Sequence, residues 1–95
     1  MDKTRKCAEE ALDLSDAIEK LNLGLLGVKR IEGEVDEFSG YCNIPADDVH
    51  VVRRVLADGI DLHKEGRYDD AKNAFSTAKT FVLTDALLAI KKGRV

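Results

Sequence analysis

The stretch EGRYDDAKNAFSTAK, residues 65–79, decides the fold of this chain. Gly66, Tyr68, Ala71, Phe75 and Ala78 follow one another at steps of two, three, four and three residues. Steps of three and four place side chains on one face of an α-helix, and glycine suits the left-handed residue that ends a helix. The stretch therefore predicts a turn followed by a helix.

The sequence around this stretch predicts two antiparallel helices between residues 45 and 92. Pro45 suits a first helical turn, and the two aspartates that soon follow it stand where the helix dipole favours negative charge. Because the loop at Gly66 is short, the two helices must pack side by side as a hairpin. We expect the small residues Gly59, Ala71 and Ala78 to let the backbones approach, with Tyr68 and Phe75 filling the space at either end.

Seven positions of this hairpin resemble one tetratricopeptide repeat: Gly59, Leu62, Gly66, Tyr68, Ala71, Phe75 and Ala78. The resemblance covers about residues 52–82, roughly a third of the chain. Val55 stands where that family usually has tryptophan, Asp58 where it prefers leucine, and Leu83 where it prefers proline. The resemblance implies a helical hairpin, and hairpins of this kind commonly present a groove to a partner.

An N-terminal helical arm followed by a C-terminal hairpin is also similar to a small archaeal family known as a domain of unknown function. The stretch KEGRYDDAKNAFSTA is comparable with that family's KGDY…A…A hairpin. Arg67 stands where the family has aspartate, and the final helix lacks the family's aromatic-glycine pattern. This resemblance implies a fold and no activity.

Residues 1–43 predict a helical arm with one apolar face. Its apolar positions are Cys7, Ala11, Leu14, Ile18, Leu21, Leu25, Val28, Ile31, Val35, Phe38 and Cys42. The stretch LNLGLLG interrupts the arm with Asn22, Gly24 and Gly27, which are weak helix formers. We predict a kink or break near residues 22–27, with one continuous helix as the alternative. Gly40 and Asn43 are expected to end the arm.

These patterns predict an all-α, three- or four-helix bundle in which residues 1–95 form a single domain. The composition, 44% hydrophobic and 35% charged, is too apolar for a disordered chain. One repeat-like hairpin cannot bury its own hydrophobic face. The arm, or a second chain, must therefore cover the hairpin.

A cytoplasmic location is expected from the sequence. No hydrophobic run approaches the roughly 20 residues of a membrane span, and acidic residues stand where a signal peptide would be apolar. Two cysteines are too few for a disulfide scaffold. Cys7 and Cys42 lie on the apolar face and are expected to be free, buried thiols. A redox pair is the alternative, because Arg5 and Lys6 flank Cys7.

No catalytic, cofactor-binding or metal-binding residues are predicted. Asp47 and His50 have the i, i+3 spacing that di-iron bundles use, but a metal site needs three or four convergent ligands. His63 lies near a helix end, where the dipole favours a histidine cation. Nothing pairs it with a nucleophile or a second base, so we do not expect an enzyme.

The sequence favours protein–protein interaction or self-association as the function. The alternative is a nucleic-acid accessory protein that uses Arg53, Arg54 and the basic tail, although a net charge of −3 matches nucleic acid poorly. A metal-binding bundle is a less favoured alternative. Residues 31–52 contain six acids and no lysine or arginine. We interpret this run as a solvated acidic face, with docking of a basic partner as the alternative.

Overall fold

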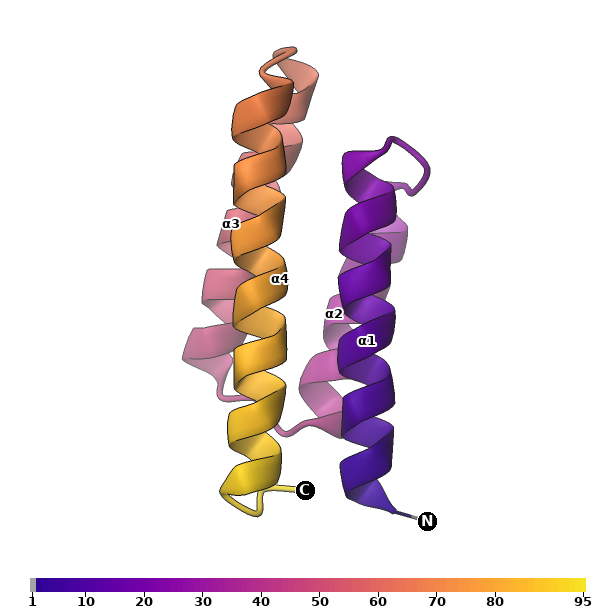
Figure 1. Cartoon of the computed structure of the whole chain (residues 1–95), viewed down its shortest axis with the longest axis vertical. Helices are drawn as coiled ribbons and strands as arrows, with labels where there is room; N and C mark the ends of the chain where they lie inside the picture. Colours follow the sequence, from indigo (N-terminus) through magenta and orange to yellow (C-terminus); the bar gives the residue numbers. More distant parts are fainter. Residues whose placement is uncertain (1) are drawn as a thin grey trace.

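The computed structural model describes residues 2–95, which form four helices and no strand. The helices are α1 (Lys3–Asn22), α2 (Val28–Tyr41), α3 (Ala46–Lys64) and α4 (Tyr68–Lys91) (Figure 1). The predicted all-α bundle is confirmed. Among these residues, no helix combines the length and apolar composition that crossing a membrane requires.

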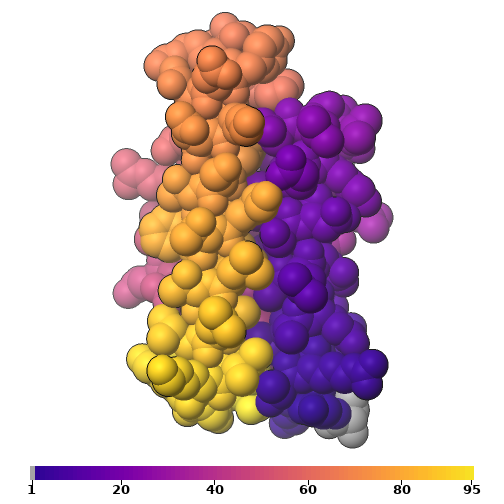
Figure 2. Space-filling view, in the orientation of Figure 1, coloured from indigo at the N-terminus to yellow at the C-terminus, as the bar shows by residue number. Residues whose placement is uncertain are grey.

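The four helices form two layers. Helices α1 and α4 lie side by side on the face shown in Figure 2, and α2 and α3 lie behind them in Figure 1. Helix α3 packs most extensively on α4, and α1 packs on both α4 and α2, whereas α2 and α3 contact each other only sparsely. The arm therefore covers the hairpin through α1, and the bundle stays open between α2 and α3.

The apolar face predicted for the arm is buried, except at the break. Nine of its positions are in the core: Cys7, Ala11, Leu14, Ile18, Leu21, Ile31, Val35, Phe38 and Cys42. Leu25 and Val28 were expected there too, and this is wrong, because their exposed fractions are 71% and 42%. The chain leaves the helix after Asn22 and re-enters it at Val28. The predicted break is thus confirmed: Leu25 lies within it, and Val28 lies at its edge as the first residue of α2.

A residue with positive φ follows each helix. Gly66 after α3 has φ +77°, and the Arg67 N–H donates to the Leu62 carbonyl at 3.0 Å, which closes the last turn. After α2 the residue with positive φ is Asn43, with φ 51°. Asparagine tolerates this left-handed conformation better than most residues. Gly40, expected as a further stop signal, lies inside α2 instead.

The hairpin contact depends on small residues, as the sequence predicts. Ala71 and Ala78 are fully buried. A Cβ atom added at Gly59 would lie 2.6 Å from Cε1 of Phe75, so the ring occupies the space that a side chain would need. Tyr68 does not fill the other end of the contact, because its exposed fraction is 61%. It begins α4 beyond the end of α3, and its ring packs edge-on to His63 with centroids 4.9 Å apart.

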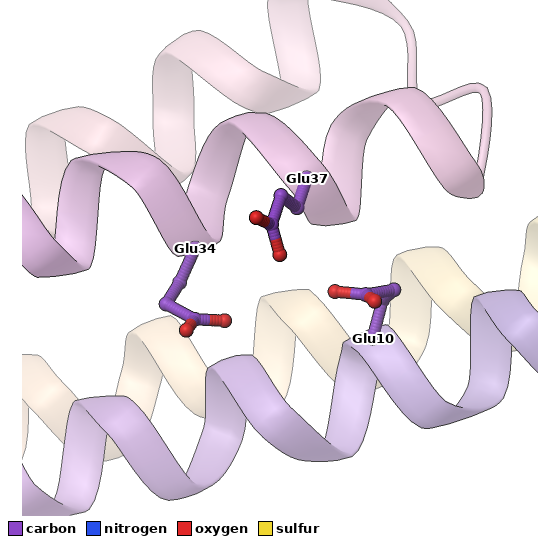
Figure 3. A group of neighbouring side chains, drawn as sticks. All are labelled: Glu10, Glu34 and Glu37. Carbon is purple, nitrogen blue, oxygen red and sulfur yellow. The ribbon is translucent and has the colours of Figure 1, made fainter.

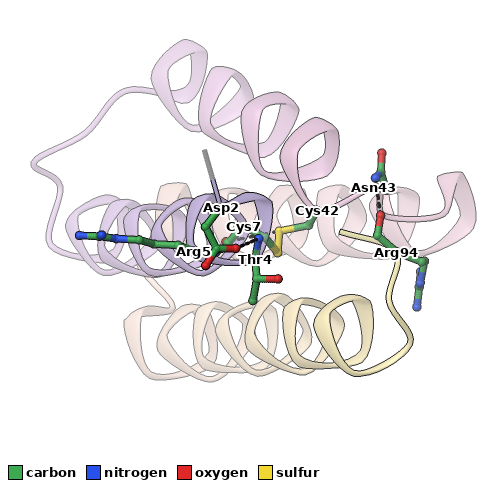
Figure 4. The surroundings of a disulfide bond; sticks show 7 residues. All are labelled: Asp2, Thr4, Arg5, Cys7, Cys42, Asn43 and Arg94. Carbon is green, nitrogen blue, oxygen red and sulfur yellow. Dashed lines mark hydrogen bonds between the residues drawn. A yellow bond between two sulfur atoms is a disulfide. The ribbon is translucent and has the colours of Figure 1, made fainter.

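A disulfide joins Cys7 of α1 to Cys42, which follows α2 (Figure 4). The expectation of two free thiols is therefore wrong. Both cysteines lie on the predicted apolar face, and the fold-back of α2 on α1 brings their Cα atoms to 4.8 Å, within the range that a disulfide spans. At the same end of the bundle, Asn43 Nδ2 donates to the Arg94 carbonyl at 2.7 Å, which ties the C-terminal residues to α2.

Asp85 on α4 carries an unfavourable charge. Burial raises the pKa of its carboxyl, the negative charge of Asp48 on α3 raises it further, and Arg94 opposes the shift. A carboxyl with a higher pKa in the folded than in the unfolded chain costs no stability below the unfolded pKa. The cost grows as the pH rises above the unfolded pKa, and it is complete once the pH exceeds the folded pKa. The Asp85 charge therefore destabilises the fold at neutral pH.

Asp85→Asn is expected to raise the melting temperature at pH 7 and to leave it unchanged near pH 2.5. Solvent screens this half-buried group, so we expect a gain of no more than about 0.5 kcal/mol, or roughly 2–4 °C. Thermal unfolding followed by circular dichroism at the two pH values measures the difference. Asp61→Asn, at an exposed position of α3, is the control. An equal gain at both pH values would contradict the electrostatic explanation.

Candidate interaction groove

Helices α2 and α3 enclose a groove of about 510 Å³. Two turns of each helix supply its walls, and these two helices lie behind α1 and α4 in Figure 1. The lining residues are Val28, Ile31, Glu32, Val35 and Asp36 from α2, and Arg53, Leu56, Ala57 and Ile60 from α3. The volume is within the range of pockets that bind ligands or receive side chains of a partner.

The floor of the groove is apolar. Ile31, Val35 and Leu56 are buried core residues whose outer surfaces line the bottom of the groove. Val28 and Ile60 continue the apolar surface up the walls, one exposed and the other half-buried. These side chains would pack against α2 or α3 in a closed bundle. Here the sparse contact between α2 and α3 leaves them facing the groove.

Charged groups line the rim. Arg53 of α3 pairs with Asp36 of α2 across the groove, with both side chains at least half exposed. An ion pair this exposed contributes about 0–1 kcal/mol to stability, so it holds the two walls only weakly. Glu32 adds a second carboxylate to the rim. The rim thus has two acids and one base.

The structure brings one of the predicted interaction residues to this groove. Arg53 lies on the rim, whereas Arg54 is exposed and does not line it. The seven positions of the hairpin motif do not line it either: Gly59, Leu62, Gly66, Tyr68, Ala71, Phe75 and Ala78. The buried motif residues lie at the α3–α4 contact or in the core, and Leu62 is half-buried and packs against the core.

The groove itself was missed by the sequence analysis. The apolar spacing of Ile31 and Val35 predicts burial, which is confirmed, and gives no sign that these residues form the bottom of a groove. The run of acids from residue 31 to 52 was a usable signal, because Glu32 and Asp36 belong to it and both line the rim.

The structure offers no support for ligand binding by Asp47 and His50, which are both exposed near the start of α3. A different set of potential ligands comes together between α1 and α2: Glu10, Glu34 and Glu37. Their positions are distant in sequence, and only the fold-back of α2 on α1 makes them neighbours.

Comparison of the chain with protein-family models, with curated proteins and with solved structures gives no match.

Proposed function

We propose that this protein is a helical interaction module whose α2–α3 groove binds an amphipathic helix of a partner protein. The observation that supports this most directly is the groove between α2 and α3, whose lining is mostly apolar. Apolar side chains that line a groove with a charged rim are typical of sites that receive the apolar face of a helix.

The length and charge of the groove indicate the length and charge of the helix that it fits. The lining residues span 28–36 on α2 and 53–60 on α3, or about 10–12 Å along each helix. That length accommodates about two turns of a bound helix, with apolar anchors at i, i+3 or i+4, and i+7. Because Glu32 and Asp36 outnumber Arg53 at the rim, we expect lysine or arginine beside those anchors.

Nucleic-acid binding was the alternative. Arg53 is paired with Asp36, and the chain has a net charge of −3. Binding a phosphate through Arg53 would first require this pair to separate, in a surrounding that repels phosphate. The proposal therefore names a protein helix as the partner.

We propose a cytoplasmic location only for a cell whose cytosol allows disulfides to persist. Cytosolic thiols are reduced in most organisms, whereas secreted proteins and some hyperthermophile cytosols retain disulfides. The Cys7–Cys42 disulfide thus adds a condition that the sequence-based expectation did not contain.

Ala57→Glu is expected to abolish binding of the partner helix without unfolding the protein. Ala57 is exposed and lines the groove, so glutamate there places a charge on the apolar wall. The probe is a library of displayed amphipathic helices of about 14 residues, selected on the oxidised protein. We expect selected helices to have i, i+3, i+7 apolar anchors and to bind Ala57→Glu at least about tenfold more weakly.

Ala46→Glu is the matched control, because it makes the same change at an exposed position of the same helix outside the groove. Helices that bind native protein and both variants equally would contradict the proposal, as would a selection that yields no binder. Light scattering across a dilution series tests for self-association. A dimer that dissociates in Ala57→Glu and persists in Ala46→Glu would identify the bound helix as one from a second copy.

A further inference from the structure

Three glutamates from two helices meet on the side of α2 that faces α1. Glu10 comes from α1, and Glu34 and Glu37 come from α2, one turn apart (Figure 3). Their carboxylates extend into the space between the two helices, and one oxygen of each lies within 4.8 Å of the others. The i, i+3 spacing of Glu34 and Glu37 puts both on the face that α2 presents to α1.

Glu10 is the unusual member of this cluster. Its exposed fraction is 4%, the lowest of any charged residue that the structure describes. One carboxylate oxygen, Oε1, pairs with Lys6 Nζ at 3.0 Å. The other, Oε2, is buried and has no hydrogen-bond partner among residues 2–95. A buried carboxylate oxygen without a partner is costly and rare in folded proteins. We therefore expect a ligand to bind Oε2.

The cations around the cluster do not balance its charge. Lys6 pairs with Glu10 at 3.0 Å, and Arg30 Nε lies 3.6 Å from Glu34 Oε1. Within residues 2–95, Glu37 makes no ion pair. Three carboxylates therefore face two cationic side chains, and a bound cation would reduce their mutual repulsion.

We propose that Glu10, Glu34 and Glu37 bind a calcium ion between α1 and α2. Carboxylate oxygens are the ligands that hard divalent cations prefer. Three oxygens bound to one Ca²⁺ at about 2.4 Å lie about 4.2 Å apart when spread evenly around it, so oxygens that already lie within 4.8 Å of one another reach a common ion after small side-chain shifts. Mg²⁺ demands near-ideal octahedral geometry, loses its water ligands reluctantly and is seldom held by protein ligands alone, so we expect it to bind here less tightly.

The surroundings can complete the coordination. Glu37 is exposed and the Glu34 side chain is 17% exposed, so water reaches the outer side of the site and can supply the remaining ligands. Lys6 competes with the ion for Glu10. The Lys6 ammonium also lies 4.8 Å from the centroid of the Tyr41 ring. Lys6 keeps this cation–π contact when Glu10 binds the ion instead of Lys6.

This site is separate from the groove. Glu32 and Asp36 face the groove from one side of α2, and Glu34 and Glu37 face α1 from another. The ion would join the same two helices that the Cys7–Cys42 disulfide joins. Calcium binding therefore does not depend on whether the groove binds a helix.

Isothermal titration of the oxidised protein with CaCl₂ at pH 7 tests the proposal. We expect one ion per chain with a dissociation constant on the order of 10⁻⁴–10⁻³ M, typical of weak calcium modules, and weaker binding of MgCl₂. Glu10→Gln, and separately Glu34→Gln with Glu37→Gln, should weaken calcium binding at least about tenfold, since even indirect partners of a metal site matter that much. Lys6→Gln should strengthen calcium binding, because it removes the competing ammonium.

Glu9→Gln is the matched control: Glu9 neighbours Glu10 on α1 but is exposed, and its removal should leave calcium affinity unchanged. Circular dichroism confirms that each variant is folded. If Glu10→Gln fails to fold, the Glu34→Gln/Glu37→Gln variant still decides, because both of its positions reach solvent. No heat of binding and no rise in melting temperature at 10 mM CaCl₂, or equal affinity in the native protein and that double variant, would overturn the proposal.

Discussion

Reduction of the Cys7–Cys42 disulfide is expected to lower the free energy of unfolding by about 4 kcal/mol. The bond closes a loop between residues 35 apart in sequence. In the chain-entropy model, cross-linking a loop of that length restricts the unfolded chain by about this amount at 25 °C. Since a domain of this size has a total stability of about 5–10 kcal/mol, the bond contributes a large share of it.

Urea unfolding of the oxidised protein, the reduced protein and Cys7→Ala/Cys42→Ala measures this effect. Both cysteines are fully buried, so the double variant also loses packing and should be somewhat less stable than the reduced protein. Reductant should shift the midpoint of the native protein and leave that of the double variant unchanged. Equal midpoints for oxidised and reduced native protein would show that the bond does not stabilise the fold.

Gly59→Leu is expected to destabilise the protein by about 3 kcal/mol, at the upper end of the usual cost of overpacking. A Cβ atom at this position would meet three atoms of the Phe75 ring at 2.6–3.0 Å. The ring is itself buried, so it can move aside only by displacing its neighbours in the core. The larger side chain must therefore push the two helices apart.

The matched control is Gly33→Leu, the same substitution at a helical glycine where an added Cβ meets no atom within 4 Å. There we expect a gain of up to about 1 kcal/mol, because leucine is the better helix former. Phe75→Ala removes the obstructing ring at a cost of about 3–5 kcal/mol. Combined with Gly59→Leu, it should cost less than the sum of the two single changes. Additive losses in urea unfolding would mean that the two residues do not compete for one space.

The sequence by itself determined which segments are helical and which faces of them are apolar. The periodic positions of the arm from Cys7 to Leu21 and from Ile31 to Cys42 are buried as predicted. The turn at Gly66, the break after Asn22 and the burial of Ala71 and Ala78 are also confirmed. These features are local, because helical period, backbone freedom and side-chain size act over a few neighbouring residues.

The tertiary structure alone decided which of these surfaces meet. An apolar period predicts that Cys7 and Cys42 are buried, but only the fold-back of α2 on α1 places their Cα atoms close enough for a disulfide. The same fold-back brings Glu10 to Glu34 and Glu37, two acids that the sequence analysis assigned to a solvated acidic face.

The groove depends on the relative position of two helices. Ile31 and Leu56 both have the spacing of core residues and are buried, and the sparse contact between α2 and α3 places them at the bottom of a groove. Tyr68 differs from its prediction in the same way. Its position in the motif predicts packing against α3, but α3 ends at Lys64 and Tyr68 is exposed. Periodicity specifies the face of each helix that avoids water, whereas the distance and offset between helices follow from how all the side chains pack together.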